Sequence, residues 1–494
     1  MYTQDSLNTD VLIVGSGGAG VAAAIEAAEL GARVVVLERE AKLGGAASIS
    51  GGGCCMAGTP FQQENGVEDS PDLAFADWVR FGGGEADEEW AHFYIDHTRH
   101  DLYEWAQARG VKWVGLMQQE GNSVLRWHRP DRGGPGLWKA LHEAALSAGA
   151  GTWLASTAAT ELIMDQGRVV GVRARNVDTG ETVELLAKAV VMTTGGFASN
   201  LDMIYEHCPH LREHRILEGS HVGARGEGHR MVERASGATT HMNELWLYVY
   251  STPDYRDPRG RRGLAVRGIP DAIWVNAQGQ RFHNETLSGG ASGAPAVLAQ
   301  KPAECWSILD NSIREGLTVG DPYYYEEGST ARDWTKIVTL LEESPDIKSS
   351  ETLEGLAAEI GVPAGALTET VSRYNGHIEQ GLERDPDFDR PLTGLCKITN
   401  PPFLAIHFFP LARKNFGGVK TDLRCRVLSK QYEPIPGLYA AGELTGMAGG
   451  HINGKSGLEG TMLGPSLFSG RVAAAWAACE AGFGSGFVGK PNRS

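Results

Sequence analysis

The sequence predicts an α/β fold in which one domain, built on a parallel sheet, is interrupted by an inserted second domain. Two short apolar runs near the start, VLIV at residues 11–14 and VVVL at residues 34–37, have the length and composition of buried parallel strands. The Ala-rich stretch 20–30 between them predicts a helix, so a β-α-β unit opens the chain. Short strands beside glycine clusters return after about residue 403, which indicates that both ends of the chain build the same domain.

The middle of the chain has a different character and predicts the inserted domain. From about residue 243 aromatic residues cluster, and proline and arginine become frequent. Residues 271–282 predict strand, turn and strand, and residues 350–378 predict a helix pair broken at Gly361-Val362-Pro363. The flanking domain is expected to add a long helical region at 72–110, a buried strand at 187–192, a strand at 437–441 and a terminal helix around 470–481.

Length, composition and net charge limit the classes of protein to which this chain can belong. The 494 residues correspond to two to three domains of ordinary size and carry a net charge of −16. That charge argues against nucleic acid and against an anionic membrane surface as partners. No apolar run reaches the ~18 residues that a transmembrane helix requires. The start, MYTQDSLNTD, lacks the basic and apolar regions of a signal peptide, so we expect a cytoplasmic protein, with a homo-oligomer left open.

The cysteines give no sign of cross-links or metal. There are seven, and only Cys54 and Cys55 lie close together in sequence. No C-x-x-C motif occurs, so we expect neither a disulfide framework nor a zinc or iron–sulfur site, and no metal site of any kind.

The first glycine motif follows the first expected strand. Gly15, Gly17 and Gly20 fit G-x-G-x-x-G, in which the glycines permit a tight turn, close approach of backbone to a pyrophosphate, and close packing of helix on strand. The helix that follows offers its amide groups and the positive end of its dipole to phosphates. Glu38 ends the second strand, where its carboxylate would accept from both ribose hydroxyls and disfavour a 2′-phosphate. The motif predicts a Rossmann-type dinucleotide site that does not select NADP.

Three further glycine clusters favour FAD over NAD. Residues 44–53 read GGAASISGGG, residues 193–197 read TTGGF, and residues 437–443 read GLYAAGE. NAD needs no second cluster soon after the acidic residue, whereas a longer dinucleotide with an isoalloxazine ring lies along backbone for a greater distance. Glycine sites at both ends of the chain are typical of flavoproteins in which both ends complete one cofactor site.

These motifs resemble the succinate dehydrogenase/fumarate reductase flavoprotein superfamily, which also contains the 3-ketosteroid dehydrogenases. The resemblance covers nearly the whole chain and is carried by VLIVGSGGAGVAAAIEAAELGARVVVLER, GGAASISGGG, TTGGF, DAIWVNAQGQRFHNE, PPFLAI, FGGVKTD, IPGLYAAGELTG and GTMLGPSLFSGR. Within it, residues 58–72 are most similar to the bacterial 3-ketosteroid 4-dehydrogenases. The resemblance implies a FAD-binding domain of residues 1–245 and 406–494, with an inserted α+β substrate-capping domain of residues 246–405.

The resemblance also implies which residues contact FAD. They come from the glycine clusters, from the end of the second strand and from the last loop: Gly15, Gly17, Gly18, Ala19, Gly20, Glu38, Arg39, Gly44, Gly45, Ala46, Ser48, Gly51, Gly52, Thr194, Gly195, Gly442, Glu443, Gly460, Thr461 and Leu463. Members that bind flavin covalently do so through an early histidine. No histidine precedes His92 here, so we expect non-covalent FAD.

The sequence departs from the fumarate reductases of this superfamily at two positions. They carry an arginine just after the RF-x-NE segment as proton donor, whereas here Glu285 is followed by TLSGG. They carry another arginine in the last glycine loop to hold a carboxylate, where this chain has KSGLEGT around Gly457. Both differences argue against a dicarboxylate substrate. The tyrosines that steroid dehydrogenases have in that loop are replaced by Gly457, Leu458 and Glu459.

Desaturation next to a carbonyl requires a donor to the carbonyl oxygen, a base, and a hydride acceptor. A preorganised donor contributes on the order of 3 kcal/mol. The resemblance implies backbone amides near Gly460 or Thr461 as one donor, with a tyrosine as the usual partner. The candidate tyrosines are Tyr248, Tyr250 and the run Tyr323-Tyr324-Tyr325, each of which could instead pack in a core.

Two further candidate catalytic residues are an arginine and a histidine. Arg413 precedes a loop that touches the flavin in relatives, and it could bind a carboxylate or carbonyl or pair with an acid structurally. His451 lies near a substrate-contacting histidine of relatives, with a solvated loop histidine as the alternative. We therefore take Tyr250, Tyr324, Arg413 and His451 as the candidate catalytic residues.

The expected function is a FAD-dependent desaturase of a cyclic ketone, either a 3-ketosteroid or a smaller alicyclic keto acid such as 4-oxocyclohexanecarboxylate. Because no haem motif (C-x-x-C-H) occurs, the electrons would leave to an external acceptor. The alternative is the reverse chemistry, an enone or enoate reductase of fumarate-reductase type. A third interpretation is a FAD-holding protein that binds a partner without turnover.

Overall fold

The computed structural model describes residues 9–326 and 331–492, so the expectation about the first residues lies outside the described part. Contacts divide the chain into two compact units. The first unit comprises Met1–Met203, Ser220–Leu245 and Lys414–Ser494, and the second comprises Ile204–Gly219 and Trp246–Arg413. The segment 204–219 was not foreseen as part of the second unit. That this unit caps a substrate, with the domain limits expected from the sequence, stays a proposal.

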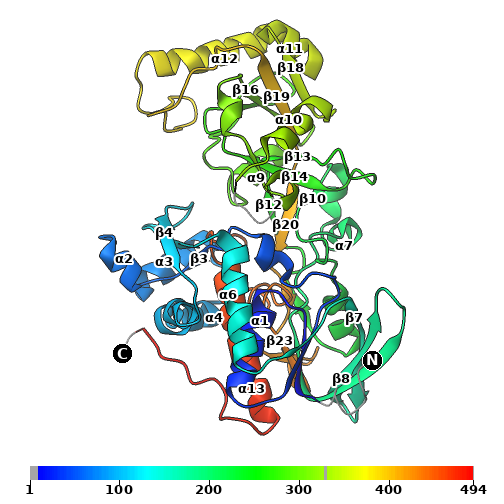
Figure 1. Ribbon diagram of the computed structural model, residues 1–494. Helices are drawn as coiled ribbons and strands as arrows, with labels where there is room; N and C mark the ends of the chain where they lie inside the picture. Colours follow the sequence, from blue (N-terminus) through cyan, green and yellow to red (C-terminus); the bar gives the residue numbers. More distant parts are fainter. Residues whose placement is uncertain (1–8, 327–330, 493–494) are drawn as a thin grey trace. The chain divides into compact units, whose positions relative to one another are not determined.

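The first unit is built on an eight-stranded sheet (Figure 1). Its main path runs β22-β23-β9-β1-β2-β6, and β7 and β8 extend from β9 as an antiparallel ribbon. The strands are β1 (Thr9–Val14), β2 (Val34–Leu37), β6 (Thr152–Leu154), β7 (Thr157–Asp165), β8 (Arg168–Asn176), β9 (Thr182–Met192), β22 (Arg426–Leu428) and β23 (Pro434–Ala440). Since β6, β2, β1, β9 and β23 are mutually parallel, their carboxyl ends meet at one edge.

Alternate residues of the parallel strands face two separate hydrophobic clusters. Val11 and Ile13 of β1 join the cluster that contains α1 (Gly18–Glu29) and α13 (Leu463–Glu480). Leu12 and Val14 join the cluster on the opposite face, beneath β7 and β8. Because both faces of these strands are buried, their sequences are continuous apolar runs and do not alternate between apolar and polar residues. The β-α-β unit expected at the start of the chain is therefore confirmed, with Val11 opposite Val34.

The expected helical region at 72–110 is broken into shorter pieces. Helices α3 (Pro71–Phe81) and α4 (Glu88–Ile95) are separated by Gly82, Gly83 and Gly84, and each begins with a side-chain cap, from Ser70 and Asp87. A π-helical segment at Thr98–Glu104 leads into α5 (Trp105–Gln107). The remaining elements of this unit are α2 (Pro60–Glu64), α6 (Gly133–Ser147), α8 (Glu227–Arg234), a sheet of β3 (Cys54–Cys55), β5 (Trp127–Pro130) and β4 (Trp113–Met117), and the pair β11 (Thr239–Thr240) and β21 (Gly418–Val419).

The second unit contains a four-stranded antiparallel sheet of order β15-β16-β19-β18. These strands are β15 (Ile273–Val275), β16 (Cys305–Leu309), β18 (Ile347–Ser350) and β19 (Phe403–Phe408). The expected helix pair is confirmed as α11 (Leu353–Ile360) and α12 (Ala364–Glu379), separated at Gly361 with φ +71°. Of the strand, turn and strand expected over residues 271–282, the second strand is wrong, because the turn closed by Asn276 and Gln280 leads into irregular backbone.

Two three-stranded sheets complete the second unit. One has the order β13-β14-β17, from Ser251–Pro253, Gly263–Arg267 and Thr318–Val319. The other has the order β10-β20-β12, from Leu217–Glu218, Leu411–Asn415 and Leu245–Tyr248. Besides α11 and α12, this unit contains α9 (Gly293–Leu298) and α10 (Trp334–Glu343), and α7 (Leu201–His207) crosses the division between the units. In the described ranges we find no helix with both the length and the apolar composition to cross a bilayer.

Candidate active site

The first glycine turn joins β1 to α1 at the carboxyl edge of the sheet. Gly15 has φ +108°, and a Cβ there would lie 2.4 Å from the Thr193 carbonyl oxygen. A Cβ on Gly20 would lie 1.9 Å from the Gly15 carbonyl oxygen, so neither of these two positions admits a side chain. Gly17 differs, because a Cβ there would meet no atom within 4 Å. The space beside Gly17, at the N-terminus of α1, is where a pyrophosphate can approach backbone amides.

Glu38 follows β2 and is held by the first turn. Its Oε2 accepts hydrogen bonds from the Ser16 amide (3.0 Å) and hydroxyl (2.5 Å), and its Oε1 accepts from the Glu40 amide (3.0 Å). An ionised carboxylate has about four acceptor positions, so it can still accept from ribose hydroxyls. The Ser16 hydroxyl also accepts from the Gly44 amide at 2.8 Å, a bridge between two glycine clusters that the sequence analysis missed.

The second glycine cluster lies against the first turn. Gly44 and Gly45 both have positive φ values and start a 3₁₀ helix at Gly45–Ile49. A Cβ on Gly45 would lie 3.5 Å from the Gly17 Cα, so the backbones of the two glycine clusters lie side by side. The Arg39 guanidinium, also expected at the cofactor, forms an ion pair with Glu227 at 2.5 Å.

The third and fourth glycine clusters follow β9 and β23 at the same edge. Thr193 donates its hydroxyl hydrogen to the carbonyl oxygens of Val14 and Gly15. Two buried oxygens here, Thr194 Oγ1 and Glu443 Oε1, have no hydrogen-bond partner. Buried polar atoms are seldom left unpaired, and a cofactor rich in hydroxyl and phosphate groups would satisfy both. The glycine cradle, Glu38 and these two oxygens therefore fit FAD.

The last glycine loop contacts the strand β3. The Gly460 carbonyl accepts from the Cys55 amide at 3.0 Å, and a Cβ on Gly460 would lie 3.0 Å from the Trp127 ring. The Thr461 amide and hydroxyl both bond the Leu458 carbonyl, at 3.1 and 2.5 Å. Thr461 is therefore engaged within the loop, and the Gly460 amide is left as the expected carbonyl donor.

The two candidate tyrosines of the second unit have different surroundings. The Tyr250 oxygen accepts from Arg267 Nη2 at 2.7 Å, and its ring packs against Tyr248 with centroids 4.9 Å apart. Tyr324 is fully buried, and burial raises the pKa of its hydroxyl. Its ring lies 5.0 Å from the Arg256 guanidinium. These contacts favour the packing alternative for Tyr324 and leave Tyr250 as the stronger candidate.

Arg413 lies on β20, also in the second unit, and donates to the Gly219 carbonyl. Within the described ranges, no carboxylate lies at ion-pair distance from it. Burial, opposed by Asp321 and reinforced by the charge of Arg413, lowers the pKa of the Arg262 guanidinium. Arg262 and Arg413 flank β10 on opposite sides, since Glu218 pairs with Arg262 and with Ala412. Arg262 pairs with Asp321 at 3.9 Å, so Arg413 is the guanidinium that favours an anionic ligand.

His451 is almost fully buried in the first unit, with 3% of its surface exposed. Its ring stacks on His241 with centroids 3.6 Å apart, and its Nε2 has no hydrogen-bond partner. Burial, and then the charge of His241, lowers the pKa of His451 to about 4. The solvated alternative is therefore wrong, and the imidazole is neutral at physiological pH.

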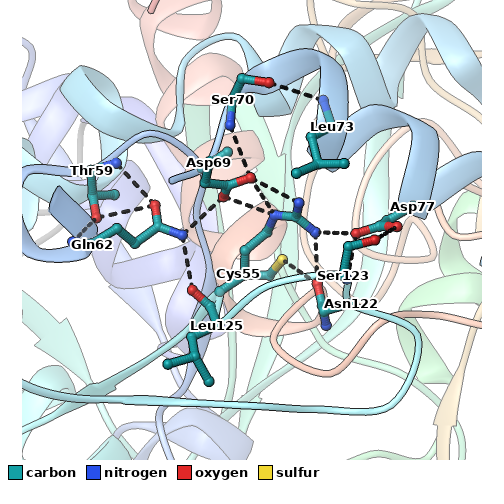
Figure 2. Close-up of polar contacts among 12 residues, drawn as sticks. Cys55, Thr59, Gln62, Asp69, Ser70, Leu73, Asp77, Asn122, Ser123 and Leu125 are labelled. Atoms are coloured by element: carbon teal, nitrogen blue, oxygen red, sulfur yellow. Dashed lines mark hydrogen bonds and ion pairs between the residues drawn. The ribbon is translucent and has the colours of Figure 1, made fainter. Parts of the chain in front are cut away.

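A buried ion-pair network, also missed from the sequence, includes Asp69, Asp77 and Asn122 (Figure 2). Arg126 binds Asp69 through Nε and Nη2, both at 2.8 Å, and Asp77 through Nη1 at 2.5 Å. Asn122 Oδ1 accepts from Arg126 at 3.2 Å and lies 3.8 Å from the Cys55 sulfur. The network thus fixes the strand β3, whose Cys55 amide holds Gly460. No motif marks these residues, because they are separated by 49 and 57 positions in the chain.

One group of side chains in the described part has a geometry that could suit a metal ion. It consists of His377, Asp385 and Asp387, in the second unit. Asp385 already pairs with Arg281, and Asp387 with Arg373. Since both carboxylates are neutralised by arginines, we assign no ion to this group.

Comparison with known proteins identifies the family. Residues 10–463 match the family model described as FAD binding domain. The chain is 32% identical over 469 residues to the "Fumarate reductase (cytochrome)" of Shewanella frigidimarina, covering 94% of this chain and 76% of that protein. It is 28% identical to a KsdD-like steroid dehydrogenase of Mycobacterium tuberculosis, covering 96% of each.

Solved structures agree with this relationship. The 3-ketosteroid-Δ4-(5α)-dehydrogenase of Rhodococcus jostii, solved with 4-androstene-3,17-dione, superimposes with a TM-score of 0.70 at 30% identity and covers 95% of this chain and 97% of that chain. The fold class expected from the sequence is confirmed by these matches. The chain belongs to the FAD-binding family that includes fumarate reductases and ketosteroid dehydrogenases, and it is a FAD-dependent oxidoreductase.

Proposed function

We propose that this oxidoreductase introduces a C=C bond next to the carbonyl of a cyclic ketone, either a 3-ketosteroid or a smaller alicyclic keto acid. The observation that supports the proposal is that the last glycine loop has no cation available for a substrate carboxylate. Its one lysine, Lys455, is paired with Glu85 at 2.6 Å, and the expected donor to the substrate is the neutral backbone amide of Gly460. A dicarboxylate needs cations for its carboxylates, whereas a ketone oxygen needs only a neutral donor.

The chemistry divides among this chain's residues as follows. The Gly460 amide is the proposed donor to the carbonyl oxygen, and such a donor makes the α-proton more acidic. Tyr250, whose oxygen accepts from Arg267 Nη2 at 2.7 Å, is the residue proposed to remove that proton. FAD, when bound, would accept the hydride that leaves the β-carbon, and an external electron acceptor would be needed to reoxidise it.

The guanidinium group of Arg413 favours the keto acid among the two substrate classes. In the described part of the chain this half-buried arginine has no carboxylate partner, so it is suited to bind one from a ligand through a charge-assisted hydrogen bond. A 3-ketosteroid offers no such anion. The two substrate classes can therefore be separated by which compound reduces the flavin.

The test is anaerobic mixing of purified holoenzyme with candidate ketones, followed at the visible flavin band. We expect 4-oxocyclohexanecarboxylate to bleach the band, and cyclohexanecarboxylate, which has the anion but no ketone, to leave it unchanged. Bleaching by 3-ketosteroids alone would reassign the substrate within the proposal. If no cyclic ketone of either class bleaches the flavin, the proposal fails.

The reverse reaction, reduction of an enone or enoate, is the second candidate. The 32% identity to a fumarate reductase over 94% of this chain is the observation in its favour. It predicts that dye-reduced enzyme is reoxidised by cyclic enones faster than oxidised enzyme is reduced by the matching ketones. Stopped-flow measurement of both half-reactions with the same carbon skeleton decides between the directions.

A further inference from the structure

Lys414 is a half-buried cation for which neither the expected FAD contacts nor the proposed reaction has a role. It lies at the end of β20, next to Asn415, with 19% of its side chain exposed. Its Nζ lies 3.4 Å from Glu443 Oε2, and within the described ranges this is its one ion pair. A close charge-assisted bond has a length of about 2.7–2.9 Å, and an ammonium has about three donors. The Lys414 ammonium is therefore incompletely satisfied by Glu443.

The backbone around Lys414 is fixed to the expected cofactor loops. Asn415 Nδ2 donates to the Glu443 carbonyl at 3.0 Å, and Asn415 Oδ1 accepts from the Phe197 amide at 3.1 Å. A Cβ on Gly196 would lie 2.4 Å from Glu443 Oε1. Lys414 thus emerges from a strand that is tied to both the third and the fourth glycine clusters, at the carboxyl edge of the parallel sheet.

The pair does not have the geometry of an ion pair whose role is structural. Glu443 is nine-tenths buried, with 9% of its surface exposed, yet its Oε1 has no partner and its Oε2 meets Lys414 only at 3.4 Å. By comparison, Lys420 of the same unit lies 3.1 Å from Asp87, and Arg471 lies 2.7 Å from Glu26. A buried charge pair is costly unless its remaining lone pairs and protons are satisfied. A ligand that donates to Glu443 and attracts the ammonium would complete the group.

We propose that the Lys414 ammonium, positioned by Glu443, sets the reduction potential of the bound flavin. Hydride uptake adds two electrons and one proton, and therefore one negative charge, to the cofactor. A fixed cation in a poorly solvated site stabilises that charge far more than water does. Lys414 then favours electron transfer from substrate to flavin. Because the effect acts on the cofactor, it holds for a steroid or a keto acid alike.

Sulfite binding tests the proposal without any substrate. Sulfite adds to oxidised flavin and leaves a negative charge on the ring, so a nearby cation strengthens its binding. We expect Lys414→Met to raise the sulfite dissociation constant at least tenfold, and Lys414→Arg to keep it within about threefold. The midpoint potential of Lys414→Met, measured by dye equilibration, should fall by about 30 mV for each tenfold change, as a two-electron couple requires.

Lys420→Met is the matched control, because it removes a half-buried lysine that is paired with Asp87 instead of Glu443. It should leave both sulfite affinity and potential unchanged. Lys414→Gln repeats the test with a polar neutral side chain in case the methionine variant folds poorly. The proposal is overturned if either neutral variant binds FAD and sulfite as the parent does. It is also overturned if both neutral variants lose FAD while Lys414→Arg keeps it, since Lys414 would then serve cofactor retention.

Discussion

Arg126 and Asp69 form a bidentate ion pair, and neither side chain is exposed to solvent. Two of the guanidinium nitrogens, Nε and Nη2, each lie 2.8 Å from a carboxylate oxygen of Asp69, and Nη1 lies 2.5 Å from Asp77. Asp69 lies just before α3 and Arg126 just before β5, so the pair joins these two segments. It therefore holds in place the small sheet whose strand β3 contacts the last glycine loop.

Arg126→Met should destabilise the protein strongly. Removing one partner of a buried ion pair leaves an uncompensated charge, which costs about 3–5 kcal/mol. Urea unfolding of the FAD-free protein measures the loss. Arg80→Met is the control, because Arg80 also pairs with Asp77 but is 60% exposed, and exposed pairs contribute about 0–1 kcal/mol. Equal losses of unfolding free energy in the two variants would show that the buried ion pairs of Arg126 stabilise the protein no more than an exposed pair does.

The same network predicts a dependence of stability on acid. Burial would raise the pKa of Asp77, but hydrogen bonds from Arg126 and Ser123 outweigh it and lower the pKa to about 2. A carboxyl with a lowered pKa in the folded state stabilises the fold above its unfolded pKa of about 3.9. That stabilisation is lost as the pH falls from about 4 towards 2. Asp77→Asn should flatten this part of the curve of unfolding free energy against pH, measured by urea titration.

Gly17 and Gly20 should respond differently to alanine. A Cβ on Gly20 would lie 1.9 Å from the Gly15 carbonyl oxygen, so Gly20→Ala must displace backbone and should cost about 2 kcal/mol or more in the FAD-free protein. Gly17 has φ −65° and open space around it, so Gly17→Ala should leave FAD-free stability within about 0.5 kcal/mol. Its Cβ would instead occupy the space for phosphate and weaken FAD binding at least tenfold. Fluorescence titration with FAD measures the affinity, and unchanged affinity in Gly17→Ala would contradict this placement.

The sequence predicted those parts of the fold that short-range patterns encode. The strand at 11–14, the glycine turn and the strand at 34–37 follow from apolar runs and spacing within 40 residues, and the structure pairs Val11 with Val34 as expected. The break between α11 and α12 was equally visible, because glycine and proline stand there. The break of the region at 72–110 was missed, although Gly82-Gly83-Gly84 stands in the printed sequence.

The parts that could not be predicted depend on contacts between distant residues. Asp69, Asp77 and Arg126 look like solvated charges in the sequence, and only their burial shows them to be one network. The segment 204–219 joins the second unit because β10 pairs with β20, almost 200 positions later. Lys414 belongs to no recognised motif. Only its distance to Glu443 and the burial of both side chains single it out. Periodicity contains no information about such pairings.

His451 should make the folded protein sensitive to mild acid. Its pKa is lowered to about 4 by burial and by His241, whereas an unfolded histidine titrates near 6.5. The unfolded state therefore binds more protons below about pH 6.5, and stability is lost as the pH falls from there towards 4. His451→Asn should reduce this loss by on the order of 1–2 kcal/mol, read from urea unfolding at pH 7 and pH 5. His241→Asn should act in the same direction but less, and an unchanged pH slope in both variants would contradict the pKa shift.

Arg413→Met should separate the two substrate classes of the proposed reaction. If Arg413 binds the carboxylate of an alicyclic keto acid, its loss removes a charge-assisted hydrogen bond of about 1.5–3 kcal/mol and lowers kcat/KM by about 10- to 100-fold. Turnover of a cyclic ketone without a carboxylate, such as 4-methylcyclohexanone, should change less than threefold. Arg259→Met is the control, because Arg259 is 59% exposed and already paired with Glu218 and Asp257. Steady-state kinetics with a dye acceptor supply both values, and equal losses on the two ketones would assign Arg413 a structural role at Gly219.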